Sequence, residues 1–169
     1  MEIRPARVED AAPLARVHVA TWQAAYEHVF GAERLAAVEA ERRVQAWERS
    51  LREPAAHDAV FVAEVEDAGL VGFASVGSCR DGPDTPGGEL YALYVLPEEW
   101  GSRAGTALLA AGLDALRGAG YDEAILWVLE DNPRARRFYE REGWRPDGGR
   151  RTGQHLGVET TEVRYRRVL

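Results

Sequence analysis

The sequence predicts a mixed α/β domain in which helices flank one central β-sheet. The first observation is the stretch 89–116, which predicts a buried strand, a tight turn and a helix in that order. Apolar side chains alternate to both sides of this strand, as is typical of a strand covered on both faces. We expect one face to carry Leu90, Ala92, Tyr94 and Leu96, and the other to carry Tyr91, Leu93 and Val95. The second observation is the unbroken apolar run 125–129, which predicts another buried strand, joined to the first by a right-handed parallel crossover.

The first half of the chain predicts one short strand, two helices and a hairpin. The strand covers residues 2–6, and Asp10 is expected to cap the first helix. A charged, solvated helix is expected from residue 32 to about residue 51. The next two runs, 59–66 and 70–78, are rich in β-forming residues and flank a glycine-containing turn, so they predict a hairpin.

The second half adds the elements around the organising strand. The segment 79–88 has strong turn chemistry and predicts an exposed loop. Asn132 is expected to cap the last helix, and Trp144 starts the next strand. A polar, glycine-rich loop is expected at 148–157, followed by a closing antiparallel strand at 158–169.

Length and composition predict a single domain over residues 1–169 that stays in the cytoplasm. The apolar runs are too short to span a bilayer, and the N-terminus lacks the basic and apolar regions of a signal peptide. The one cysteine, Cys79, cannot form an internal disulfide, and the four histidines lack ligand spacing, so we expect no metal. The net charge of −7 argues against nucleic-acid binding and favours cationic or neutral small partners. All 21 basic residues are arginine.

The helix after the organising strand is expected to start near Arg103, and its first turn can bind an anion. The first N–H groups of a helix lack internal partners and lie at the positive end of the helix dipole. A phosphate or pyrophosphate fits such a site. We therefore expect the backbone N–H groups of Arg103, Ala104, Gly105, Thr106 and Ala107 to bind one. A Walker-type loop is excluded because no Gly-Lys-Ser/Thr follows, and a dinucleotide-binding fold fits badly because the strand, turn and helix come late in the chain.

Two aromatic residues of the first helix, Trp22 and Tyr26, lie one turn apart on a face with few charges. This spacing is typical of core residues. The same two rings are also candidates for binding a substrate, and the sequence leaves both interpretations open.

Three segments together resemble the GNAT superfamily of N-acetyltransferases: residues 93–97 (LYVLP), 100–105 (WGSRAG) and 132–144 (NPRARRFYEREGW). Each alone is weakly specific, but their order and their separation by one predicted strand are strong evidence. The order of elements and the opening residues 3–6 with Asp10 also resemble the family, so the resemblance covers essentially the whole chain. It implies the GNAT fold and transfer of an acetyl group from acetyl-CoA to an amine.

The resemblance also implies roles for individual residues. Acetyl-CoA would lie alongside Leu93, Tyr94 and Val95 like a further strand, with the Val95 backbone N–H directed at the thioester oxygen. Tyr139 resembles the family's tyrosine that protonates the departing thiolate, whereas the alternative makes it a core aromatic residue. The Asn132 amide would contact the pantetheine arm in addition to capping its helix.

Glu89 lies where some family members carry a glutamate general base, and the alternative is a solvent-exposed acid at a strand start. Tyr91 is expected on the same side, where it could assist the base or bind substrate. The acceptor would be a primary amine of a small molecule or the amino group of a peptide. Its site would be built from the first two helices, including Trp22 and Tyr26, and from the loops 79–88 and 148–157. We expect no nucleic-acid or membrane partner, and a homodimer is left open.

The turn at 100–105 departs from the family pattern, which is Arg or Gln, two residues, Gly, any residue, then Gly or Ala. Trp100 stands in the first place and Arg103 in the place of the first glycine, so only Gly105 matches. Backbone N–H groups bind phosphate whatever their side chains are. The Arg103 replacement nevertheless favours a second hypothesis, a catalytically quiet acyl-CoA-binding module.

Overall fold

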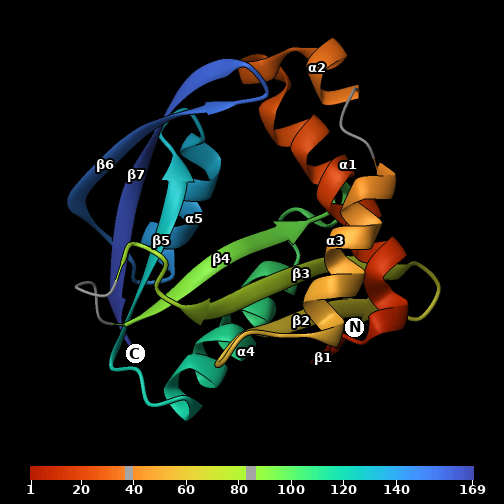
Figure 1. Ribbon diagram of the computed structural model, residues 1–169, viewed down its shortest axis with the longest axis horizontal. Coiled ribbons are helices and arrows are strands. Elements are labelled where there is room, and N and C mark those ends of the chain that lie inside the picture. Colours follow the sequence, from red (N-terminus) through yellow and green to blue (C-terminus); the bar gives the residue numbers. More distant parts are fainter. Residues whose placement is uncertain (37–39, 83–86) are drawn as a thin grey trace.

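The computed structural model describes residues 1–36, 40–82 and 87–169, and its centre is a seven-stranded sheet (Figure 1). The strand order is β1-β2-β3-β4-β5-β7-β6. The strands are β1 Glu2–Pro5, β2 Ala59–Val65, β3 Gly69–Ser78, β4 Gly88–Val95, β5 Glu123–Leu129, β6 Arg145–His155 and β7 Val158–Val168. Neighbouring strands pair antiparallel except β4 and β5, which are parallel. The predicted mixed sheet and the parallel pairing after the crossover helix are therefore confirmed.

Helices cover both faces of the sheet (Figure 1). They are α1 Ala11–Phe30, α2 Ala32–Ala36, α3 Ala40–Arg52, α4 Ala104–Gly118 and α5 Pro133–Arg141, with short 3-10 turns at Val8–Asp10 and Pro97–Glu99. On one face, leucines of α4 and Tyr139 of α5 join a core cluster with β3, β4, β5 and β7. On the other face, Leu14 and Val17 of α1 pack with Phe73 of β3, and Trp47 of α3 packs against the same cluster. The apolar repeat that predicts α4 is the stripe that this helix buries.

A β-bulge in β4 changes which side chains share a face. Ser75 of β3 lies opposite Ala92, whereas the next residue, Val76, lies opposite Leu90, so Tyr91 is one extra residue in β4. Leu90 consequently packs on the α4 side with Leu93 and Val95, while Ala92 and Tyr94 pack on the α1 side. The prediction that Leu90 shares a face with Ala92 and Tyr94 is wrong, because one inserted residue shifts a two-residue alternation by one.

Strands β4 and β5 pair only over a short stretch among the described residues. The paired residues of β4 are Gly88, Glu89 and Leu90, which lie opposite residues 124–126 of β5. Residues 88–90 are buried, but residues 91–95 are only half-buried. The expectation of a strand covered on both faces therefore holds for the start of β4. Beyond Leu90 the two strands diverge, and the sheet opens at its centre.

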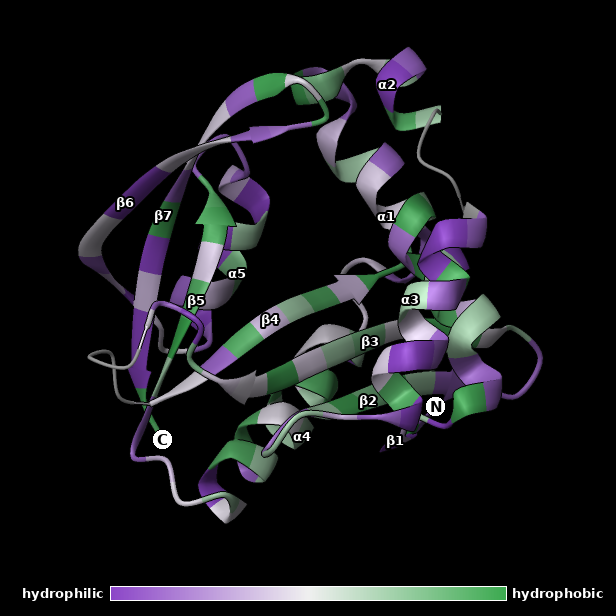
Figure 2. Cartoon of the chain, viewed as in Figure 1, coloured by the Kyte–Doolittle hydropathy of each residue, from purple (hydrophilic) through white to green (hydrophobic). Residues whose placement is uncertain are grey.

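The segment predicted as the loop 148–157 is mostly strand. β6 runs from Arg145 to His155 and pairs with β7, and the reversal is confined to Leu156 and Gly157, which both have positive φ. β6 is an edge strand and is largely exposed, so it needs no apolar face. Figure 2 shows β6 mostly in hydrophilic colours. A polar, glycine-rich strand of this kind lacks the alternation on which strand prediction depends.

Two other expectations need correction or restriction. Asp10 does not cap α1 through its side chain, because its carboxylate accepts two hydrogen bonds from Arg4 and one from the Arg7 N–H. The hydrogen bonds from Arg4 hold the pKa of this carboxyl below its usual range.

The helix expected at residues 32–51 corresponds to α2 and α3, with residues 37–39 outside the described part. Residues 83–86 of the predicted loop 79–88 also lie outside it. Of the described helices, none combines the length and apolar character needed to cross a membrane.

Candidate active site

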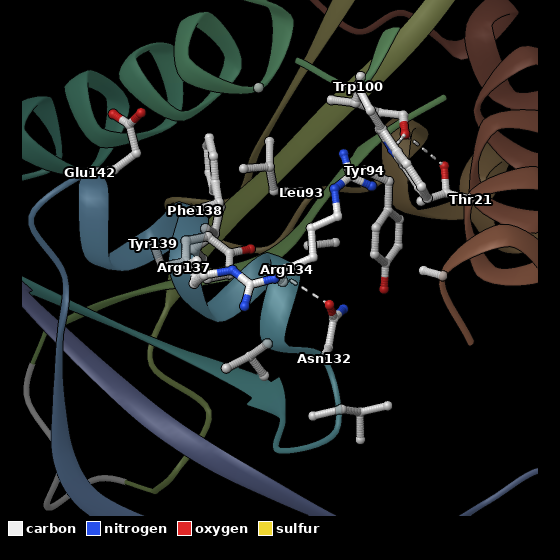
Figure 3. A pocket seen from close by; sticks show the side chains of 18 of the residues that line it. Thr21, Leu93, Tyr94, Trp100, Asn132, Arg134, Arg137, Phe138, Tyr139 and Glu142 are labelled. Carbon is white, nitrogen blue, oxygen red and sulfur yellow. Dashed lines mark hydrogen bonds between the residues drawn. The ribbon is translucent and has the colours of Figure 1, made fainter. Parts of the chain in front are cut away.

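A cavity of about 750 Å³ lies where β4 and β5 diverge. Its walls come from α1, from residues 90–95 of β4, from the turn before α4, from the first turn of α4, from β5 and from α5. His155 of β6 and Glu162 of β7 complete the lining. Because these elements belong to both faces of the sheet, the cavity connects the α4–α5 side with the α1 side. Figure 3 shows Phe138 and Tyr139 of α5 across from Tyr94 and Trp100.

The backbone of β4 presents an open edge to this cavity. The Leu96 N–H donates to the Val71 carbonyl of β3 over 2.8 Å, so the N–H and C=O of the preceding residue, Val95, point to the opposite edge. The Val95 carbonyl accepts hydrogen bonds from the Trp100 indole at 2.7 Å and from the Thr21 hydroxyl at 3.3 Å. Leu93, Tyr94 and Val95 all line the cavity. At Val95 this edge of β4 pairs with no strand among the described residues. The side chains of Trp100 and Thr21 hold the Val95 carbonyl in position.

Three phenols, those of Tyr26, Tyr94 and Tyr139, line the cavity. Tyr139 is 8% exposed, its ring packs edge-on against those of Phe138 and Trp144, and burial raises the pKa of its hydroxyl. Burial also raises the pKa of Tyr26 and Tyr94. Tyr139 is therefore both a core residue and a lining residue, so the two interpretations of it are compatible. A phenol held neutral in this way keeps its proton near neutral pH. In acid–base chemistry it can therefore act as an acid but not as a base.

Asn132 and Trp22 position the other two phenols. The Asn132 side-chain oxygen accepts the Ala135 N–H at 3.0 Å, which confirms its predicted role as helix cap. Its amide nitrogen donates to the Tyr26 hydroxyl at 3.3 Å. The Trp22 indole donates to the Tyr94 hydroxyl at 3.0 Å. Trp22 and Tyr26 line the cavity and also pack against each other, so both interpretations of this pair are compatible.

Only two of the five residues predicted to bind a phosphate at the start of α4 line the cavity. Gly105 and Thr106 line it, together with Gly101 and Ser102 of the preceding turn. Arg103, Ala104 and Ala107 are not among the described lining residues; Arg103 is exposed and Ala104 is buried in the core. The Ala104 N–H is taken by the Ser102 hydroxyl at 3.2 Å. The N–H groups of Gly105 and Thr106 are therefore the ones placed to bind an anion.

Three arginines of α5 line the same part of the cavity and were missed from the sequence. Arg134, Arg137 and Arg141 follow the i, i+3, i+7 spacing that places side chains on one helix face. The Arg134 guanidinium carbon lies 3.3 Å from the centre of the Trp100 ring, and burial lowers the pKa of this arginine. The sequence shows the spacing of these arginines. It does not show that this face of the helix points toward the cavity, because five of the nine residues of α5 are charged.

Glu89 is neither exposed nor part of the cavity lining. It is 2% exposed, and its carboxylate accepts hydrogen bonds from the Arg80 guanidinium at 2.6 Å and from the Arg80 N–H at 2.8 Å. The interpretation of Glu89 as a solvent-exposed acid is therefore wrong. Tyr91 does line the cavity, but its hydroxyl lies 2.7 Å from the Ser78 carbonyl and 3.1 Å from Asp58, and burial raises its pKa. This hydroxyl is engaged as a donor and is a poor base.

The described residues contain no group of three or more His, Cys, Asp or Glu side chains that could hold a metal ion.

Comparisons with known proteins agree on one family. Residues 19–144 match the sequence model of the Acetyltransferase (GNAT) family. The chain is 36% identical over 132 residues to the N-acetyltransferase YuaI of Bacillus subtilis (strain 168). The matching region covers 78% of this chain and 73% of that protein. Its fold matches the crystal structure of a ribosomal-protein-alanine N-acetyltransferase from Brucella melitensis, with a TM-score of 0.73, 25% identity and 100% coverage of both chains.

A third comparison shows the fold together with a cofactor. The PaiA N-acetyltransferase of Thermoplasma acidophilum, solved in complex with coenzyme A, has a TM-score of 0.74 over 99% of this chain and 98% of that one, at 21% identity. The open centre of the sheet, the motif residues around it and the matching family model lead to one conclusion. The chain belongs to the GNAT family of N-acetyltransferases.

Proposed function

We propose that this protein transfers the acetyl group of acetyl-CoA directly to a primary amine, either of a small molecule or of a peptide. The observation that carries the proposal is the cavity at the centre of the sheet, in which the open backbone edge at Val95 and the Tyr139 hydroxyl line the same space. A thioester bound there meets a hydrogen-bond donor for its oxygen and an acid for its sulfur.

Acetyl-CoA is the proposed donor, and its phosphates have a suitable place in the cavity. The N–H groups of Gly105 and Thr106 lie at the positive end of α4, and the arginine stripe of α5 lies beside them. The coenzyme A in the Thermoplasma neighbour supports this choice of cofactor class. The pantetheine arm would then run along Leu93, Tyr94 and Val95, within reach of Asn132.

The proposed reaction is a single displacement. The amine nitrogen attacks the thioester carbonyl carbon, and the Val95 N–H stabilises the negative charge that develops on the oxygen. The C–S bond then breaks, the Tyr139 hydroxyl gives its proton to the sulfur, and the nitrogen releases a proton to a base. Glu89 remains the proposed base. Because its carboxylate does not line the cavity, this role requires a water relay.

The alternative of a catalytically quiet acyl-CoA-binding module depended on crowding by Arg103. In the structure Arg103 is exposed and is not among the described lining residues, so it leaves the first turn of α4 open. Membership of an N-acetyltransferase family also favours the enzyme.

Release of free thiol from acetyl-CoA in the presence of an amine panel tests the proposal. The panel comprises aromatic and aliphatic monoamines, polyamines, aminoglycosides and an alanine-initiated peptide. Thiol release that depends on both an amine and the enzyme, with acetylated amine detected by mass spectrometry, supports it. Binding of acetyl-CoA in a thermal-shift assay without turnover of any amine would instead support the quiet module.

A further inference from the structure

The two ends of the cavity differ in the charged side chains that line them. The end formed by α4 and α5 carries Arg134, Arg137 and Arg141. Its carboxylates are Glu99 of the turn and Glu142, which accepts a hydrogen bond from Thr106 at 2.9 Å. The end formed by α1, β5 and β7 carries Glu162. An anionic donor and a cationic acceptor would therefore be drawn to different ends.

Glu162 is held in place by a cross-strand neighbour. It lies opposite Arg151 of β6 and Leu129 of β5, and its Oε2 accepts a hydrogen bond from Arg151 Nε at 2.6 Å. The Arg151 guanidinium also stacks on the Trp127 ring, 4.3 Å from its centre. The Glu162 side chain is 17% exposed, and its Oε1 has no hydrogen-bond partner within the described part of the chain. A fixed carboxylate with one oxygen free thus lines the cavity.

This carboxylate lines the same cavity as Tyr26, Tyr94 and Tyr139. Burial is the main cause of the raised pKa of Tyr26 and Tyr94, and the charge of Glu162 adds to it. Rings surround the same end of the cavity, with Trp22 and Tyr26 on α1 and Trp127 on β5. A small amine bound to Glu162 would therefore have apolar walls around its body and the thioester site beside its nitrogen.

We propose that Glu162 binds the ammonium group of the acceptor, so that the preferred substrates are primary amines with an apolar or aromatic body and no carboxylate next to the amine. The bound ammonium gives one proton to solvent before the reaction, and the neutral amine that remains is the nucleophile. This inference rests on the proposed function, because it assigns the acceptor of that same reaction. A free carboxylate oxygen forms a charge-assisted hydrogen bond with an ammonium group. An amino acid would bring its own carboxylate toward Glu162, and repulsion would weaken its binding. His155 and Tyr26 are further titratable side chains that line this end of the cavity.

The test compares the wild type, Glu162→Gln and a matched control, Glu130→Gln. Glu130 also pairs with an arginine of β6, Arg150, but it does not line the cavity. The probes are amine pairs that differ by one carboxylate: tyramine with tyrosine, phenethylamine with phenylalanine, and 1,4-diaminobutane with ornithine. Thiol release gives kcat and KM for the pair that turns over fastest, and calorimetry gives the Kd of acetyl-CoA.

We expect the wild type to favour the amine without the carboxylate by at least about 10-fold in kcat/KM. Glu162→Gln should raise KM for that amine roughly 10- to 100-fold, narrow the preference, and leave the acetyl-CoA Kd within about two-fold. Glu130→Gln should change none of these. An unchanged KM in Glu162→Gln, an equal effect of Glu130→Gln, or a wild-type preference for amino acids would overturn the inference. Absence of turnover by the wild type would instead count against the proposed function.

Discussion

The guanidinium of Arg134 on α5 lies against the Trp100 ring, and the same indole donates its N–H to the Val95 carbonyl on β4. Trp100 stands where the family pattern has Arg or Gln. In this chain the cation beside the turn is Arg134 of the facing helix, and it rests on the ring of Trp100. Trp100 thereby connects the proposed phosphate region with the strand edge that is proposed to face the thioester.

Substitution of Trp100 should separate these two contacts. Trp100→Phe keeps a ring under Arg134 but removes the hydrogen bond to Val95, so we expect a loss of about 2- to 10-fold in kcat with little change in acetyl-CoA affinity. Trp100→Leu also removes the cation–π contact, worth about 0.5–2 kcal/mol, and should weaken acetyl-CoA binding further. Calorimetry and steady-state kinetics measure the two effects. Equal acetyl-CoA affinities in both variants would show that the ring does not support Arg134 in the complex.

Tyr139→Phe tests the leaving-group acid. The variant removes one hydroxyl of a cavity-lining residue that has no hydrogen-bond partner among the described residues, so the fold should be unaffected. We expect kcat to fall by roughly 10- to 1000-fold while the acetyl-CoA Kd stays nearly the same. Phe138→Leu, at the neighbouring lining position, serves as a packing control. Equal kcat in the wild type and Tyr139→Phe would remove Tyr139 from the mechanism.

Glu89→Gln tests the base. If Glu89 accepts the amine proton through water, the pH profile of kcat/KM in this variant should lose its acidic limb. A profile that is only lower, with the same limb, would not meet this expectation. An acidic limb that is unchanged in Glu89→Gln would assign the role to the amine itself or to a water chain.

Arg103→Gly tests the departure in the turn. Arg103 is exposed at the start of α4, so its side chain is free to move toward a bound phosphate. We expect the glycine variant to bind acetyl-CoA more weakly by roughly 1–3 kcal/mol, the range for a charge-assisted hydrogen bond. The loss should shrink at higher salt. Tighter binding by the variant in calorimetry at both low and moderate salt would mean that crowding dominates.

His18 makes folding stability depend on pH. Both of its ring nitrogens are buried without a hydrogen-bond partner in the described residues, its ring lies among Trp22, Phe73 and Tyr94, and burial lowers its pKa to about 3. Arg43 adds to this shift. Between pH 6.5 and 3 the unfolded chain binds a proton that the folded chain excludes, so stability falls as the pH falls.

His18→Phe should remove that dependence. Phenylalanine suits the aromatic surroundings and leaves no unpaired nitrogen, so the variant should be at least as stable at pH 7. Below pH 6.5 its advantage in unfolding free energy should grow by up to about 1.4 kcal/mol per pH unit. Urea unfolding across this range measures the difference, with the exposed His28→Gln as control. Parallel stability curves for the wild type and His18→Phe would show that His18 is not the titrating group.

Apolar patterns and one capping residue predicted three of the elements that build the fold. The apolar repeat in α4, the run at 125–129 and the cap at Asn132 each correspond to a buried stripe, a buried strand or a formed hydrogen bond. Strand β6 was missed because an exposed edge strand needs no alternation. The bulge at Tyr91 was missed because an extra residue in a strand leaves no mark in the amino-acid composition of that strand. It is visible only in the pairing with β3.

Where a motif or a backbone position defines a candidate site residue, as for Val95, Tyr139 and Asn132, the structure places that residue in the lining of the cavity. The site was not predictable where the fold alone decides which way a charged side chain points. Glu89 matches a family position but is directed toward Arg80, while Glu162 has no motif and yet lines the cavity. In a chain with 28 acidic residues, local sequence does not distinguish these two cases.

The short pairing between β4 and β5 has a mechanical consequence. Among the described residues, only three residues of β4 pair with β5, and this short stretch joins the strands β1–β4 to the strands β5–β7. A cofactor that hydrogen-bonds to the free edge of β4 would bridge the gap as a removable strand. The loaded protein would then be stiffer than the empty one, and each catalytic cycle would assemble and dismantle part of the β-sheet framework itself.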